Sequence, residues 1–127
     1  MDSTKGLYDL PAPRLFRTGH SDNDLSVFIH NDAAPLFRPF GPEQMGFAIF
    51  DRRDAVSVNN SHASPSISND LPRCPPGGVT FCTTDFVPGT QTPRHRTLVM
   101  DYCVAMSGEI VLALDSGVEF KLSDRRI

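Results

Sequence analysis

Short runs of alternating apolar and polar residues recur along this chain, and turn-forming residues separate them. The strictest alternation covers residues 118–122, where three apolar residues enclose two charged ones. Because successive side chains of a strand point to opposite faces, this run predicts a strand with its apolar side chains inward. Residues 109–115, nearly all apolar at their centre, predict a strand covered on both faces. Ser116-Gly117 between the two runs predicts the tight turn of a hairpin.

Further strands are predicted upstream, at residues 25–29, 45–50, 55–58, 78–86 and 100–107. These runs contain many β-branched and aromatic residues, which favour strands. No 11-residue stretch carries a convincing helical period. Many short strands divided by proline and glycine turns predict an all-β fold of the barrel or sandwich type.

Two segments lack this pattern. Residues 1–12 are expected to form a flexible arm. Residues 59–78 mix serine with proline and glycine, bury little, and predict an extended surface loop. Composition favours a mobile connector there over a functional lid. The rest of the chain, residues 13–127, is expected to form a single domain.

Bulk composition narrows the class of protein. Apolar residues make up 39% and charged residues 21% of the 127, which is typical of a soluble globular chain. The formal net charge is −3, and no run of Lys or Arg exceeds two residues, so no nucleic-acid partner is expected. The longest apolar run, 110–114, is too short to cross a membrane. The first ten residues lack a secretory signal.

The cysteines bear on the cellular compartment of the protein. Cys74, Cys82 and Cys103 are odd in number, widely spaced, and contain no Cys-x-x-Cys pair. Reduced thiols in a cytoplasmic protein are the expectation from this pattern. Cys82 and Cys103 lie in strand-like runs, where cysteine acts as a small hydrophobic residue.

One stretch carries a recognisable spacing of chemically active residues. Gly89 precedes His95 by six positions, Asp101 follows that histidine by six, and Gly108 follows the carboxylate by seven. The spacing resembles the first motif of the cupin superfamily: glycine, five residues, His-x-His, three or four residues, Glu, six residues, glycine. Thr97 stands at the position of the second histidine, and Asp101 at that of the glutamate.

The resemblance extends to a group of small fungal cupins, some of them described as cupin-domain oxidoreductases of polyketide clusters. It rests on Pro93-x-His95-Arg96-Thr97, Asp101-Tyr102, Ser107-Gly108-Glu109-Ile110 and, near the start, Arg17-Thr18-Gly19-His20. The clearest likeness covers residues 79–122, and a weaker one covers 13–51. The family would continue after Leu122 with more strands and a second histidine motif. The resemblance therefore implies a cupin-type jelly-roll barrel that is incomplete at its C-terminal side, with an uncovered strand edge.

The resemblance also implies a site. In cupins a divalent metal, such as iron or manganese, is bound by imidazoles and one carboxylate, so His95 and Asp101 are the candidate ligands. Thr97 is a poor ligand, and the support for a metal is correspondingly weak. The alternative is structural: Asp101 would pair with Arg94, Arg96 or a turn N–H. Arg96 and Tyr102 could orient a phenolic or carboxylate substrate, or serve only packing or the surface.

The function implied is that of a cupin-domain protein of fungal secondary metabolism, an oxidoreductase or isomerase acting on a polyketide-like or aromatic small molecule. Whether the chain is an enzyme stays open on these grounds, because fold analogy is weak warrant for function. The alternative is a non-catalytic binding or structural cupin, or an inactive fragment. The expected partners are a small-molecule substrate and a second copy in a homodimer, with no nucleic acid and no membrane.

Overall fold

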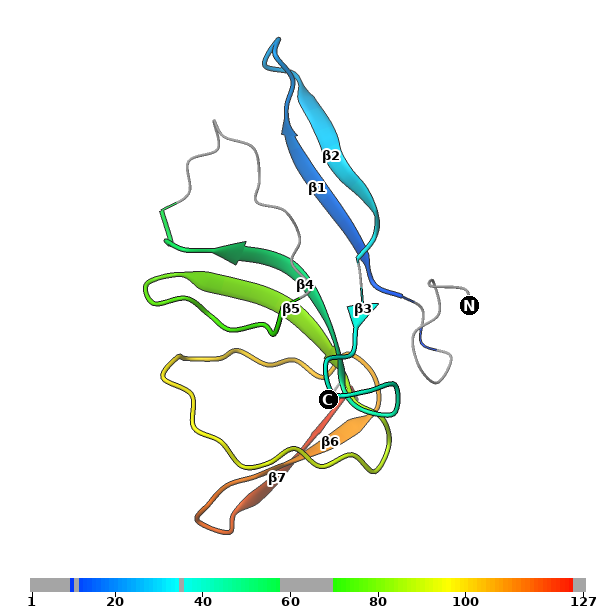
Figure 1. Ribbon diagram of the computed structural model, residues 1–127, viewed down its shortest axis with the longest axis vertical. Helices are drawn as coiled ribbons and strands as arrows, with labels where there is room; N and C mark the ends of the chain where they lie inside the picture. Colours follow the sequence, from blue (N-terminus) through cyan, green and yellow to red (C-terminus); the bar gives the residue numbers. More distant parts are fainter. Residues whose placement is uncertain (1–9, 11, 35, 58–69, 125–127) are drawn as a thin grey trace. The chain divides into compact units, whose positions relative to one another are not determined.

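The computed structural model describes residues 10, 12–34, 36–57 and 70–124. Their regular secondary structure consists of β-strands, and no helix occurs in these ranges (Figure 1). All-β architecture was the prediction from the alternating pattern, and it is confirmed. The chain divides into two compact units, residues 1–90 and 91–127, and each is described by itself.

The first unit begins with a long hairpin. β1 (Arg14–His20) pairs antiparallel with β2 (Ser26–Ala33), and the register shifts once, between Arg17 and Thr18. A turn closed by Ser21 N–H to the Leu25 carbonyl, 2.9 Å, joins the strands. The rings of Phe16 and Phe28 meet edge to face at 6.3 Å, although both side chains remain exposed.

A three-stranded antiparallel sheet completes the first unit. The short β3 (Leu36–Phe37) and β5 (Val79–Asp85) flank β4 (Gly46–Arg53), which is the central strand. Residues 46–50 of β4 are buried, and β3 pairs with two of them, Phe47 and Ala48. Ala34, Ala48 and Phe50 form the core, with Leu15 and Leu36 packed against them. The core therefore joins the sheet to the base of the β1–β2 hairpin.

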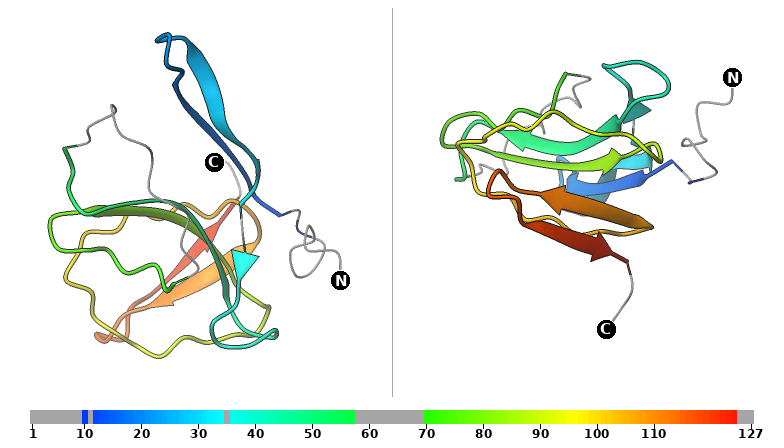
Figure 2. Two further views of the ribbon diagram at one scale, coloured as in Figure 1. Left: turned by 45° about the horizontal axis from the view of Figure 1, so that its top comes forward. Right: turned by 90° about the horizontal axis from the view of Figure 1, so that it is seen from below.

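The second unit contains the hairpin of β6 (Glu109–Ala113) and β7 (Glu119–Ser123), shown in two further views in Figure 2. Its turn lies at Asp115-Ser116-Gly117, as predicted, and Gly117 has a φ of 86°, which glycine adopts without strain. Leu114 and Val118 close the turn through a 2.8 Å hydrogen bond. On the outer face, Lys121 Nζ lies 2.9 Å from Glu109 Oε1.

The register of this hairpin gathers apolar side chains on one face. Ile110 lies opposite Leu122, and Leu112 lies opposite Phe120. Leu122 is half-buried, whereas the ring of Phe120 is 64% exposed. The prediction that β6 is covered on both faces is therefore wrong for this structure, since all five of its residues are exposed.

Some of the other predicted strands are present in the structure, and others are not. The strands expected near 25–29, 45–50 and 78–86 are present as β2, β4 and β5. Residues 100–107 are not a strand, and the described part of the expected 55–58 strand is a bend. The predicted loop lies outside the described residues as far as 69, and its remainder, 70–78, contains no strand. The predicted arm is also outside them, except for Leu10 and Ala12, and the single-domain prediction stays a prediction.

Candidate functional site

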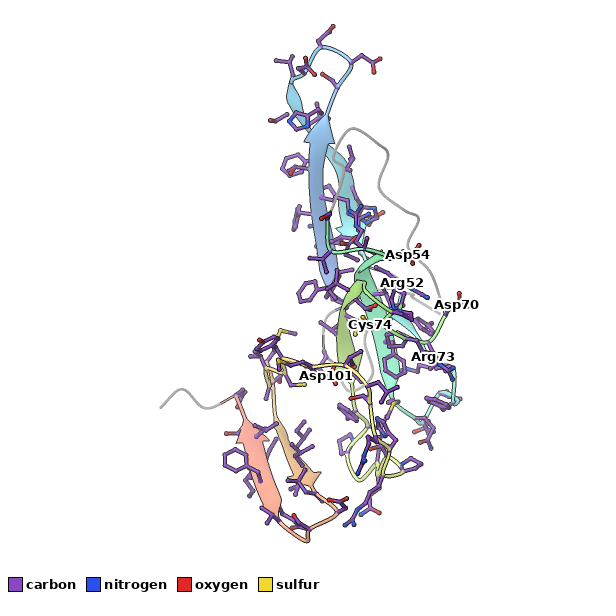
Figure 3. All side chains as sticks on the ribbon, turned by 90° about the vertical axis from the view of Figure 1, so that its left-hand side faces the viewer. Arg52, Asp54, Asp70, Arg73, Cys74 and Asp101 are labelled. Carbon is purple, nitrogen blue, oxygen red and sulfur yellow. The ribbon has the colours of Figure 1, made fainter. Side chains whose placement is uncertain are left out.

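The candidate residues lie on an irregular segment of the second unit. Residues 91–106 form no strand or helix, and a bend occupies Leu98 and Val99. Pro93 favours this conformation, because it fixes its own φ and disfavours helical geometry at the residue before it. Figure 3 labels Asp101 on the stretch that precedes β6. His95, Arg96, Asp101 and Tyr102 are all exposed.

His95 is held by the backbone just before it. Its Nδ1 lies 3.0 Å from the carbonyl oxygen of Pro93. A carbonyl oxygen only accepts, so this contact requires the proton to be on Nδ1. In the neutral ring Nε2 then carries the lone pair and is the atom available as a base or a ligand.

The bend brings Thr97 and Asp101 together. Thr97 Oγ1 lies 3.4 Å from Asp101 Oδ2 and 3.4 Å from the carbonyl oxygen of Val99. A hydroxyl has a single proton, so it donates to one of these acceptors at a time. Thr97, at the position where the family motif has a histidine, is therefore the hydrogen-bond partner of the carboxylate.

The predicted alternative partners of Asp101 are not used. In ion pairs of the described residues, Arg17 and Arg53 contact Asp51, and Lys121 contacts Glu109. Neither Arg94 nor Arg96 pairs with Asp101. The hydrogen bond to the Asp101 carboxylate comes from the hydroxyl of Thr97, and the structural interpretation of Asp101 stays a prediction.

The two predicted substrate-binding residues lie on either side of the bend. Tyr102 is 92% exposed, and the guanidinium of Arg96 also faces solvent. A free guanidinium can bind a carboxylate or phenolate, and an exposed phenol ring offers a stacking surface. Their assignment to a substrate remains a prediction.

Metal binding at this segment can be judged from its donor atoms. His95 Nε2 and the Asp101 carboxylate are suitable donors for iron or manganese. Within the described ranges, no three His, Cys, Asp or Glu side chains gather closely enough to hold a metal ion. The residues present therefore do not fit the ligand set that the cupin resemblance implies.

A second polar cluster lies in the first unit and was not singled out from the sequence. Asp51 is contacted by Arg17 Nη2 at 3.3 Å and by Arg53 Nε at 2.9 Å. Each of these side chains is at least two-thirds buried. Arg53 is two residues from Asp51, but Arg17 is 34 residues away, so sequence spacing gave no signal for the pairing.

The described part of the chain contains no helix long and apolar enough to cross a membrane. Cys74, Cys82 and Cys103 are not joined in disulfide bonds, and Cys103 is the exposed one of the three.

Comparison with known proteins identifies relatives in fungi. No protein-family model matches the chain. It is 34% identical over 115 residues to the phomopsin biosynthesis cluster protein D of Diaporthe leptostromiformis. It is 31% identical over 115 residues to the cupin-domain-containing oxidoreductase virC of Hypocrea virens, and 31% over 105 residues to the cupin-domain-containing oxidoreductase fogC of Aspergillus ruber.

These matches cover most of the chain but only part of the relatives. They take in 86%, 84% and 80% of this chain, respectively. They span 61%, 59% and 52% of the relatives' own lengths, which is less than two thirds in each case.

Proposed function

We propose that the chain is a member of the family of these fungal cupin-domain proteins, and that it acts in fungal secondary metabolism on a polyketide-like or aromatic small molecule. The observation that carries the proposal is the similarity, over more than four fifths of the chain, to a phomopsin biosynthesis cluster protein and to a cupin-domain-containing oxidoreductase. Oxidoreduction is the chemistry named for two of them, and isomerisation is the alternative chemistry.

The geometry of residues 93–102 supports a role in binding a small anion. His95 offers Nε2, Arg96 offers an unpaired guanidinium, and Tyr102 offers an exposed ring. A phenolate or carboxylate would accept hydrogen bonds from Arg96 while its ring stacks on Tyr102. His95 would then be the group that takes or gives a proton.

A second candidate is a cupin that binds a small molecule without transforming it. The exposure of His95 and Asp101 favours this candidate, because catalytic groups gain strength from exclusion of water. We place the protein in the cytoplasm, on the support of its three cysteines, which form no disulfide bond. A homodimer through the apolar face of β6 and β7 belongs to the same proposal.

The test is ligand binding followed by turnover. Saturation-transfer NMR with a set of phenolic carboxylic acids should detect binding that weakens in Arg96→Ala and in Tyr102→Ala. Arg14→Ala, an exposed arginine in the first unit, is the matched control. Liquid chromatography with mass spectrometry of the incubated ligand then separates the two candidate functions. A product of changed mass, or a new isomer, that forms only when His95 is present supports the enzymatic function. Binding without change supports the second candidate, and no binding to any member contradicts both.

A further inference from the structure

Three polar contacts lie within the segment 93–101. Pro93 accepts from His95, and Thr97 donates toward Asp101 and toward the Val99 carbonyl. Thr97 is the residue that would have to bring a third donor atom to a metal, and its hydroxyl proton goes to either the Asp101 carboxylate or the Val99 carbonyl. A neutral hydroxyl is also a weak ligand for iron or manganese, which prefer imidazole and carboxylate.

The charges next to His95 also disfavour a divalent metal. Arg94 and Arg96 flank His95, and neither is neutralised by an ion pair among the described residues. Two guanidiniums next to the one available imidazole repel a divalent cation, although solvent screens the repulsion at this exposed segment. The same two charges attract an anion.

We infer that residues 93–101 form a hydrogen-bonded motif in which Thr97 positions Asp101, and that this motif does not by itself bind a divalent metal. The residue at position 97 determines whether the motif binds a metal, because a histidine in place of Thr97 would add an imidazole two residues from His95. The inference concerns the site of the proposed function but does not rest on catalysis there, since metal retention and carboxylate position are measured without a substrate.

The experiment loads the purified chain with Mn²⁺ or Zn²⁺, removes unbound ions by desalting, and measures the retained metal by elemental analysis. The wild-type chain should retain well below one equivalent. Thr97→His should retain several-fold more, and the double variant with His95→Ala should lose that gain. Thr97→Ser keeps the hydroxyl and should behave like the wild type. Circular dichroism confirms that each variant keeps its β structure.

A second readout addresses the positioning of Asp101. The ¹³C shift of its side-chain carboxyl should change in Thr97→Val and return in Thr97→Ser, which a purely structural role would not produce. Retention of a full equivalent by the wild type, lost in His95→Ala, would overturn the inference. So would equal retention by Thr97→His and wild type, or an unchanged carboxyl shift in Thr97→Val. A chain that turns over a ligand only after metal is added would also overturn it, while leaving the proposed function standing.

Discussion

Arg17 of β1 donates a hydrogen bond to the main-chain carbonyl of Phe50, the residue that the register of β4 with β5 skips. A bulge of this kind leaves a backbone group without its partner in the ladder. Arg17 supplies the missing donor from another part of the chain, and the same guanidinium nitrogen lies 3.3 Å from Asp51. The β1–β2 hairpin is thereby fixed to the central strand at the point where the sheet is irregular.

Removing this guanidinium should cost measurable stability. Its side chain is 16% exposed, so Arg17→Ala leaves a half-buried carbonyl unpaired and Asp51 with Arg53 as its remaining partner. We expect a loss of about 1–3 kcal/mol in the free energy of unfolding, the usual cost of leaving such a group unsatisfied. Urea denaturation followed by circular dichroism measures it. Arg14→Ala, which removes an exposed bond to Asn31, should change the stability by less than about 0.5 kcal/mol. Equal losses in the two variants would contradict the anchoring role.

Two glycines of the first unit should respond differently to alanine. A Cβ at Gly78 would lie 2.1 Å from the backbone oxygen of Arg53, which cannot move without disturbing β4. A Cβ at Gly46 would meet the guanidinium of Arg38 at 2.8 Å, the flexible end of a side chain. We therefore expect Gly78→Ala to cost about 1–3 kcal/mol and Gly46→Ala clearly less, because a side chain yields more readily than backbone. Thermal unfolding of the two variants side by side checks the order, and the reverse order would refute it.

The thiols should react at different rates. Cys103 is exposed on the irregular segment, whereas Cys74 and Cys82 are half-buried. Reactivity of a thiol requires access as well as its thiolate form, so Cys103 should react first with a thiol reagent in the native chain. The fast phase should disappear in Cys103→Ser and persist in Cys74→Ser. A fast phase that survives the loss of Cys103 would show that one of the other thiols is more accessible than the structure indicates.

The strand predictions succeeded where a local pattern marked the strand and where a neighbouring strand pairs with it. Strands β4, β5 and β7 were found because alternation or an apolar run marked them. β1 was missed because its inward side is Leu15, Arg17 and Gly19, and a charged residue and a glycine hide the period. Residues 100–107 have strand-like composition, but a strand needs a paired neighbour, and none of the described strands pairs with them.

The same reasoning explains the outcome at the site. Resemblance to the cupin motif pointed to His95 and Asp101, and a motif can be recognised because its spacing is a local property of the sequence. It could not give the partner of Asp101, which depends on the bend at Leu98 and Val99 that turns Thr97 toward the carboxylate. The sequence suggested an arginine or a turn N–H as the partner of Asp101, and in the structure the Thr97 hydroxyl contacts the carboxylate.

The apolar face of the second unit should cause self-association. It is formed by cross-strand pairs of large side chains, namely Ile110, Leu112, Phe120 and Leu122. This face carries no charge, whereas the opposite one carries Glu109, Glu119 and Lys121, so a second copy can cover the first without burying an ion. Covering a large apolar side chain stabilises by about 1.5–3 kcal/mol when its burial is complete.

We therefore expect the chain, at concentrations of tens of micromolar, to run as a dimer or a larger species in size-exclusion chromatography with light scattering. Phe120→Ser should shift the chain toward monomer. The substitution removes a ring on the apolar face that is 64% exposed and that a partner would cover. Val111→Ser removes an exposed apolar side chain from the opposite face and is the matched control. It should leave the association unchanged. A wild-type chain that stays monomeric over this range, or two variants that dissociate equally, would show that the face of Phe120 is not where copies meet.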